Sequence, residues 1–225
     1  MKVLRRQPGD EVLVTVPGEG VFRALVEEVA EGGDRVVLRV GERLQEFQPT
    51  VVPWTVAVAL VKGSGMDAAV RLASELGLES LVPLLSDRSQ IRGAESGRPE
   101  RWSRIALEAA KQCGRHEPLR VEAPWRLGDL LEASRGEAQW IARPGFALPP
   151  AAALVKGGAV RPALFLVGPE GGFSDDELRA AESAGARPIG FPTPVLRTTT
   201  AVVLIAALGV LLGGSGSLEE GQECG

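Results

Sequence analysis

Between residues 165 and 178 the chain reads Phe165-Leu-Val-Gly-Pro-Glu-Gly-Gly-Phe-Ser-Asp-Asp-Glu-Leu178. An apolar segment leads into a glycine-rich turn, and Ser174 with Glu177 three residues later matches the capping box that begins a helix. Ligands of parallel α/β proteins bind where strands end, and glycines there let the backbone approach a ligand closely. The glycine spacing fits neither the dinucleotide fingerprint nor the P-loop. The stretch therefore predicts a strand, a ligand-binding turn and a helix, with an ordinary tight turn as the plainer alternative.

Strand and helix patterns also alternate on the amino-terminal side of this stretch. Thr55–Val61 is a continuous apolar run, as expected of a strand buried on both faces. Apolar residues recur at helical spacing from Met66 to Leu76, where Gly77 ends the pattern, and a second helix is expected from Pro99 to Cys113. Further strands are expected at residues 81–85, 119–122, 139–142 and 163–167. This alternation predicts an α/β fold with a mostly parallel sheet covered on both faces.

The first 52 residues follow a different rhythm of short strands. Apolar and polar residues mix at 11–16, 21–29 and 35–40, with turn signals at 17–20 and 32–34. Three short strands at this spacing predict a small β barrel or meander. We therefore expect one domain over residues 1–52 and a second over 53–225, in which the glycine- and serine-rich residues 213–225 form a flexible tail.

A second segment of interest is Pro188-Ile-Gly-Phe-Pro-Thr-Pro-Val-Leu-Arg-Thr-Thr-Thr-Ala201, which precedes an apolar helix ending near Leu212. A short strand and a proline-stiffened loop lead to three threonines, any of which suits a helix cap. A helix amino terminus beside Arg197 favours an anion. The plainer alternative is a threonine cap with Arg197 as a surface charge.

Composition excludes several classes of protein. Of the 225 residues, 44% are hydrophobic and 24% are charged, which is typical of a folded chain with a sizeable core. One histidine and two cysteines leave no metal-ligand spacing and no disulfide framework, so we expect no metal and a reducing cytoplasm. The residues from Met1 to Asp10 do not resemble a secretory signal, and the apolar run Ala201–Leu212 is too short to span a bilayer.

Charge is unevenly distributed along the chain, whose net charge is −4. Residues 86–120 hold eight basic against five acidic side chains, whereas residues 1–52 hold seven basic against nine acidic ones. A locally basic region hints at a phosphate-bearing partner, although a solvated surface has the same composition.

Two motifs together resemble the RsmE family of SPOUT-class methyltransferases. They are the stretch Leu166–Ser174 and, some two dozen residues later, Val195-Leu-Arg-Thr-Thr-Thr-Ala201. Segments that also match the family, in the same order, are Leu4–Val12, Glu75–Leu78, Val82–Ser89 and Arg101–Arg115. The resemblance implies a PUA-like amino-terminal β barrel, a SPOUT α/β domain with a carboxyl-terminal trefoil knot, and a homodimer. It also implies methylation of N3 of a uridine in 16S ribosomal RNA within the small ribosomal subunit, with S-adenosylmethionine as cofactor and no role for a membrane.

The resemblance also implies roles for individual residues. Arg197 is the candidate catalytic cation beside the base, with Arg88 and Arg115 as further candidates and His116 as a candidate general base. The residues implied for cofactor binding are Leu166, Val167, Gly168, Pro169, Glu170, Gly171, Gly190, Leu196, Arg197, Thr198 and Ala201. Those expected to bind RNA are Arg88, Arg101, Arg104, Lys111 and Arg115, four of which we expect on one helix face.

The sequence departs from the family pattern at two places. The chain begins later than the family pattern does, so we expect either a barrel shortened at its amino terminus or a misassigned start codon. Thr199 stands where the family has a glutamate. The RNA methyltransferase is the leading hypothesis, and these departures motivate one alternative, a catalytically weak or silent SPOUT-fold protein that binds RNA or assists ribosome assembly. A second alternative is an unrelated α/β nucleotide-binding enzyme.

Overall fold

A computed structural model of the chain describes residues 6–16, 19–30, 35–46, 52–89, 99–115 and 117–214. The chain divides into two compact units, Met1–Thr50 and Val51–Gly225. The expected boundary after residue 52 differs by two residues, because Val52 already belongs to the sheet of the second unit. Its backbone N–H donates to the carbonyl of Gly77 at 2.7 Å, and Val52 pairs with Leu78.

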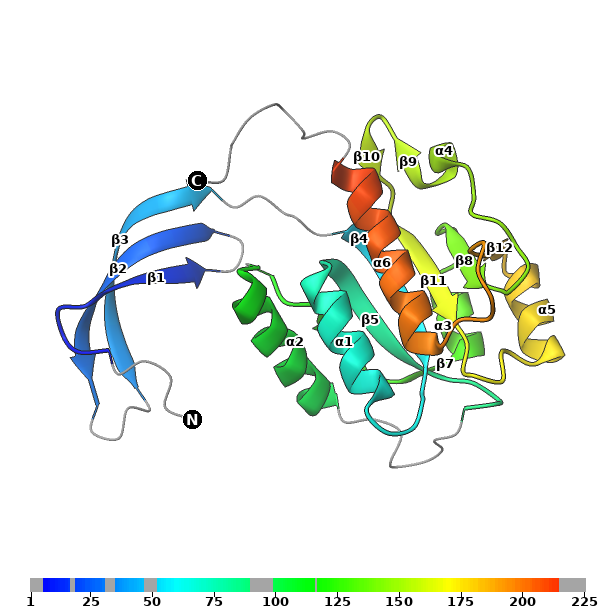
Figure 1. Cartoon of the computed structure of the whole chain (residues 1–225), viewed down its shortest axis with the longest axis horizontal. Helices are drawn as coiled ribbons and strands as arrows, with labels where there is room; N and C mark the ends of the chain where they lie inside the picture. Colours follow the sequence, from blue (N-terminus) through cyan, green and yellow to red (C-terminus); the bar gives the residue numbers. More distant parts are fainter. Residues whose placement is uncertain are drawn as a thin grey trace. The chain divides into compact units, whose positions relative to one another are not determined.

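The first unit contains a three-stranded antiparallel sheet in the order β1-β2-β3 (Figure 1). Its strands are β1 (Glu11–Val16), β2 (Gly20–Val29) and β3 (Val36–Glu46). Ala24 and Val26 of β2 are buried. The three expected strands are present, but β3 runs six residues past its expected end because residues up to Glu46 pair with β2, an interaction that local sequence does not reveal.

The second unit contains a seven-stranded sheet in which every pairing is parallel. The strand order is β12-β8-β11-β4-β5-β6, with β7 also paired to β5. These strands are β4 (Val52–Ala59), β5 (Leu78–Leu85), β6 (Arg120–Val121), β7 (Trp125–Arg126), β8 (Gln139–Ala142), β11 (Ala163–Val167) and β12 (Arg187–Ile189). The prediction of a mostly parallel sheet is therefore confirmed.

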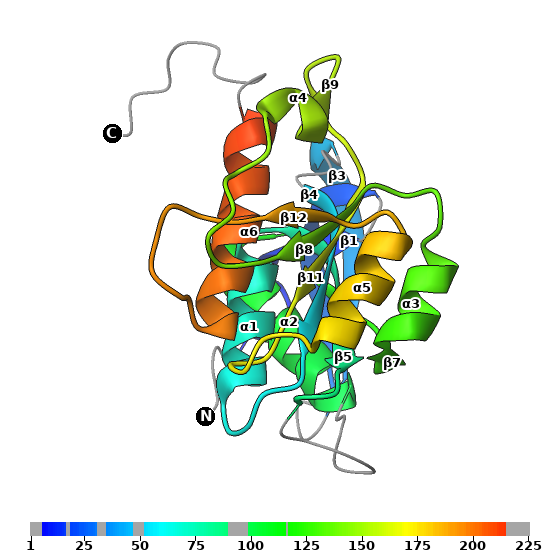
Figure 2. The same cartoon turned by 90° about the vertical axis from the view of Figure 1, so that its right-hand side faces the viewer.

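Helices cover both faces of this sheet (Figures 1 and 2). One face packs against α1 (Gly65–Glu75), α2 (Pro99–Cys113) and α6 (Thr198–Gly214). The other face packs against α3 (Leu127–Ala133) and α5 (Asp175–Ser183). The short helix α4 (Ala151–Leu154) leads into a hairpin of β9 (Val155–Lys156) and β10 (Ala159–Val160).

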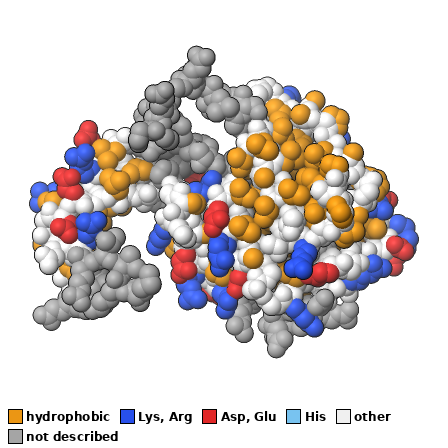
Figure 3. Space-filling view, viewed as in Figure 1, with side chains coloured by type: hydrophobic (Ala, Val, Ile, Leu, Met, Phe, Trp, Pro, Cys, Tyr) orange, Lys and Arg blue, Asp and Glu red, His pale blue; other side chains and the backbone are white. Residues whose placement is uncertain are grey.

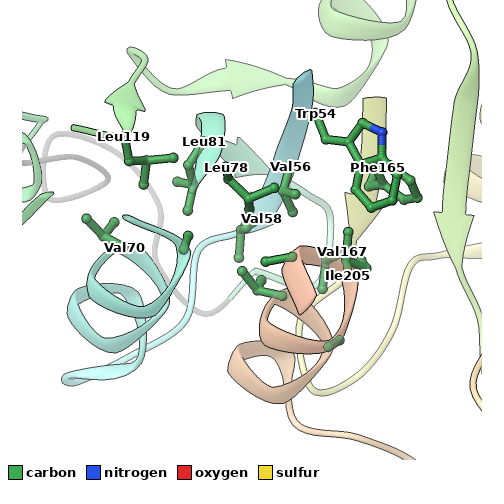
Figure 4. Packing of buried hydrophobic residues seen from close by; sticks show 14 of the residues in the cluster. Trp54, Val56, Val58, Val70, Leu78, Leu81, Leu119, Phe165, Val167 and Ile205 are labelled. Carbon is green, nitrogen blue, oxygen red and sulfur yellow. The ribbon is translucent and has the colours of Figure 1, made fainter. Parts of the chain in front are cut away.

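Central strands supply side chains to both layers of the core. Along β4, Val56 and Val58 pack toward α1 and α6, whereas the intervening Ala57 packs toward α3 and α5. Along β11, Phe165 faces the first layer with Trp54, and their ring centroids lie 4.5 Å apart (Figure 4). This double burial explains why these strands read as continuous apolar runs.

Helix α6 is longer than the sequence indicated. Gly213 and Gly214, which we expected to begin a flexible tail, are its last two residues. Residues 215–225, including Cys224, lie outside the described residues. Helix α3 and the β9–β10 hairpin were not predicted, because segments of two to seven residues are too short to show a clear period.

Candidate active site

A pocket of about 280 Å³ lies at the carboxyl ends of β8, β11 and β12. Three segments that follow these strands form its wall: residues 142–144, residues 167–173, and residues between 189 and 201. Because the three strands are neighbours and parallel, their ends meet at one edge of the sheet. This is the position where α/β proteins commonly bind ligands.

Most of the residues implied for cofactor binding meet around this pocket. Nine of the eleven line it: Val167, Gly168, Pro169, Glu170, Gly171, Gly190, Leu196, Thr198 and Ala201. Leu166 does not line it, because side chains alternate along a strand and Leu166 is buried on the α3–α5 side of the sheet. Arg197 is exposed and lies in sequence between two lining residues without lining the pocket itself.

Sequence reasoning missed the third segment of the wall. Ala142 is the last residue of β8, and Arg143 and Pro144 follow it. Strand β8 precedes β11 by some twenty residues in the chain but lies beside it in the sheet. The expected strand at 139–142 was the available signal, but its place next to β11 could not be read from sequence. Phe173 and Phe191 also line the pocket and were not proposed as site residues.

The glycine-rich turn has the local structure that its sequence predicts. The hydroxyl of Ser174 accepts from the Glu177 backbone N–H at 3.2 Å, and the Ser174 backbone N–H donates to Glu177 Oε2 at 2.8 Å. The predicted capping box is therefore confirmed. The Gly172 N–H donates to the Pro169 carbonyl at 2.8 Å, and Gly172 has a φ of 68°, which favours glycine.

A side-chain hydrogen bond joins the two motif segments. Thr198 Oγ1 donates to the carbonyl of Gly168 at 3.0 Å, so the first residue of α6 is tied to the turn after β11. Thr199 faces elsewhere, because its hydroxyl donates to the Gly65 carbonyl at the start of α1, at 3.3 Å. Thr199 does not line the pocket. Thr199, which replaces the family glutamate, therefore lies on the side of α6 that faces α1.

Two charged side chains occur among the described residues of the wall, Arg143 and Glu170. Arg143 donates to Glu182 Oε1 at 2.9 Å, and its guanidinium lies over the Phe146 ring at 4.9 Å from the centroid. Backbone groups and apolar side chains form most of the remaining wall. Such a pocket suits a ligand with a flat apolar portion and a few charged groups.

Helix α2 exposes fewer unpaired cations than we predicted. Arg101, Arg104 and Lys111 are exposed on the helix, but Glu108 is exposed among them. Arg101 forms an ion pair with Asp67 of α1. The hydrogen bond from Arg101 lowers the pKa of the Asp67 carboxyl, and burial opposes this effect.

Arg115 does not share the helix face with these residues. Helix α2 ends at Cys113, and Gly114 has a φ of 73°, so the Arg115 N–H donates back to the Ala110 carbonyl at 2.9 Å. This turn places the guanidinium of Arg115 against Gly77. Burial lowers the pKa of Arg115. The prediction of four cations on one helix face was wrong in this respect.

We predicted that the chain has no metal site and no membrane-spanning segment, and the structure bears on both only within the described residues. Within the described ranges, no group of histidine, cysteine, aspartate and glutamate side chains is arranged to hold a metal ion. None of the helices in the same ranges is long and apolar enough to cross a membrane. His116, the candidate general base, lies outside the described residues.

Comparisons with known proteins identify the family of the chain. Residues 48–210 match the sequence model of a family described as an RNA methyltransferase domain. The chain is 33% identical to the ribosomal RNA small subunit methyltransferase E of Synechocystis, and the match covers 94% of this chain and 69% of that protein.

Solved structures with the same fold include two methyltransferases. The ribosomal RNA small subunit methyltransferase E of Neisseria gonorrhoeae, bound to S-adenosyl methionine, is 25% identical, with a TM-score of 0.74 over 92% of this chain and 84% of that one. A probable rRNA-methyltransferase from Porphyromonas gingivalis is 26% identical, with a TM-score of 0.78 over 94% and 88% of the two chains. On the evidence of the two motifs, the pocket that they form and these matches, the chain belongs to the ribosomal RNA small subunit methyltransferase E family, the RsmE family.

Proposed function

We propose that this protein transfers a methyl group from S-adenosylmethionine to N3 of a uridine in 16S ribosomal RNA. The observation that carries the proposal is the pocket in which both family motifs meet, after β11 and before α6. The family name states methylation of small-subunit ribosomal RNA, and the member of the family from Neisseria gonorrhoeae is solved with S-adenosyl methionine bound. The choice of the uridine N3 atom rests on the motif resemblance.

The residues of the pocket fit S-adenosylmethionine. Val167, Ile189 and Leu196 provide apolar walls for a flat adenosyl group, and Gly168 and Gly171 line the same pocket without side chains of their own. Glu170 supplies a carboxylate that suits a positively charged sulfonium or ammonium group. When bound, the cofactor supplies a methyl group that its sulfonium has already activated, so the protein needs no metal for this step.

The protein's own residues have two tasks in the reaction. The pocket wall positions the donor and excludes water, which converts the transfer into an oriented reaction of two held groups. Uridine N3 must lose its proton before it attacks, and negative charge then develops on the base. Arg197, exposed beside the lining residues Leu196 and Thr198, is our candidate to stabilise that charge.

Mass spectrometry of 16S RNA tests the function directly. Deletion of the gene in the source organism should remove a 3-methyluridine, and the wild-type chain should restore it. Purified protein should also methylate 16S RNA or small subunits with labelled S-adenosylmethionine. Binding of cofactor and RNA without methyl transfer would instead support the alternative of a silent RNA-binding protein.

We expect α2 to contribute phosphate contacts through Arg104 and Lys111. Each is exposed, and none of the residues that the structure describes pairs with either side chain. The double variant Arg104→Ala/Lys111→Ala should reduce the slope of log affinity against log salt by about 0.7 to 0.9 per lost contact. Arg135→Ala, which removes an exposed cation paired with Glu132, is the matched control. An unchanged slope in the double variant would place the RNA on other surfaces, such as the amino-terminal unit.

We also propose that two copies of the chain associate through α6. The helix carries no charged residue, Val210 and Leu211 are exposed on it, and Leu208 is partly buried. Figure 3 shows hydrophobic side chains gathered on this side of the second unit. A contiguous exposed apolar surface of this kind marks an interaction site. Sedimentation should therefore give about twice the chain mass of 23.7 kDa, and Leu211→Glu should shift it toward that mass. A wild-type mass of one chain at working concentration would contradict the dimer.

Further features of the resemblance belong to the same proposal. The three-stranded sheet of the first unit is consistent with part of a PUA-like RNA-binding barrel spanning residues 1–52, followed by a SPOUT domain spanning 53–225. The resemblance extends the proposal to a carboxyl-terminal trefoil knot in the second of these domains. The proposal includes a cytoplasmic location and action on the small ribosomal subunit.

A further inference from the structure

The turn after β5 is bonded to the glycine-rich segment after β11. The backbone N–H of Asp87 donates to Glu177 Oε1 at 2.8 Å. Ser174 Oγ donates to Asp87 Oδ2 at 2.7 Å. Asp87 and Glu177 are separated by 90 residues in the chain, so these two bonds connect segments that follow different strands.

Arg88, the residue after Asp87, also bonds to the glycine-rich segment. Its Nη1 donates to the Gly171 carbonyl at 2.9 Å. Gly171 lines the pocket, and the carbonyl of Gly168 at the other end of the turn accepts from Thr198. Two hydrogen bonds, joined by the backbone of residues 168–171, therefore form a path from the turn that carries Arg88, along the pocket wall, to the start of α6.

Glu177 accepts one hydrogen bond beyond those of a capping box. One carboxylate oxygen, Oε2, accepts from the Ser174 N–H and completes the helix cap. The second oxygen, Oε1, accepts from Asp87 and adds nothing to the helix start. Glu177 is only 8% exposed, and charge-assisted bonds in such a site are strong and costly to lose.

We propose that Glu177 is a positioning residue, which holds the Arg88 turn against the cofactor-binding turn. This inference rests on the proposed function. Bound cofactor orders residues 168–172, and Glu177 with Gly171 transmits that order to Arg88 at the pocket edge. RNA affinity should then rise when the cofactor site is filled, and linkage requires the reverse effect to be equal.

The decisive variant is Glu177→Gln. Glutamine keeps the size of the side chain but replaces one carboxylate oxygen with an NH2 group, which only donates. In the same conformation it can accept from Ser174 or from Asp87, and its NH2 group then faces the other N–H. We expect the affinity for S-adenosylhomocysteine and kcat/KM for RNA each to fall roughly ten-fold, the loss typical of one charge-assisted bond. Asp176→Asn is the matched control, because Asp176 lies in the same helical turn, is exposed, and bonds locally to Arg179. It should behave as wild type.

Coupling distinguishes positioning from a purely structural role. RNA affinity of the wild type should rise with saturating S-adenosylhomocysteine, and this rise should disappear in Glu177→Gln. Arg88→Ala and Glu177→Gln should be non-additive in kcat/KM, because both break one path. A Glu177→Gln protein that matches Asp176→Asn in both tests would overturn the proposal. A wild-type protein that methylates no RNA would instead contradict the proposed function.

Hydrogen exchange in the wild type provides a test that needs no variant. The Asp87 amide should be protected to the same degree as the Ser174 amide, since both donate to Glu177. Fast exchange at Asp87 beside slow exchange at Ser174 would show that Glu177 only caps its helix.

Discussion

Replacement of Gly190 by alanine is expected to destabilise the second unit and abolish cofactor binding. A Cβ atom at residue 190 would lie 2.1 Å from the carbonyl oxygen of Phe146 and 2.8 Å from that of Arg143. Both contacts are with backbone, which cannot rotate away as a side chain can. Overpacking of this kind costs about 1–3 kcal/mol. The corresponding fall in melting temperature is about 2–4 °C per kcal/mol for a chain of this size.

We expect the substitution to weaken cofactor binding as well as stability, because the contacts that it disturbs also position the pocket wall. The Gly190 N–H donates to the Ala147 carbonyl at 3.1 Å, and the Arg143 N–H donates to Ile189 at 2.8 Å. Separation of these segments would therefore move two parts of the wall. Thermal unfolding and calorimetric titration with S-adenosylhomocysteine measure the two effects.

Gly128→Ala is the control for this substitution. Gly128 lies in α3 with open space around its Cβ position, so alanine there should leave stability unchanged or slightly higher. Cofactor binding should be unaffected, since α3 does not line the pocket. Normal cofactor affinity in Gly190→Ala would remove residues 143–147 and 190 from the cofactor site.

Replacement of Arg197 by alanine is expected to reduce turnover far more than RNA affinity. Its guanidinium is exposed, and within the described part of the chain no hydrogen bond or ion pair engages it. Removal should therefore cost little stability. Loss of one group that stabilises developing charge commonly lowers kcat by about 10²–10³. Single-turnover methyl transfer and RNA titration at matched salt separate the two quantities.

Two further variants test this role: Arg197→Lys keeps the positive charge, and Arg135→Ala is a control. Lysine keeps a positive charge on a flexible stem, so it should recover part of the turnover lost in the alanine variant. Arg135→Ala removes an exposed cation next to α3 and should leave kcat unchanged. An Arg197→Ala protein with normal kcat and weakened RNA binding would make Arg197 a phosphate contact instead.

Local patterns in the sequence determined much of the fold and part of the site. Ser174 and Glu177 specify a helix start through atoms three residues apart, and Gly77 specifies a helix end through its own backbone freedom. The apolar run that became β4 indicated burial on both faces. Such features depend on neighbours within one turn or strand, so the sequence alone suffices.

Only the tertiary structure decided which segments meet. The pairing of β8 with β11 brings residues 142–144 to the pocket, and no local pattern encodes which strands are neighbours. The position of Arg115 could not be read from the sequence either. The chain turns at Gly114, after the end of α2, and the guanidinium of Arg115 lies against Gly77 instead of on the helix face. Glu177 shows the difference within one side chain. Its Oε2 makes the cap that the sequence predicts, whereas its Oε1 bonds to Asp87, 90 residues away, and that contact exists only because the parallel sheet brings the ends of distant strands to one edge.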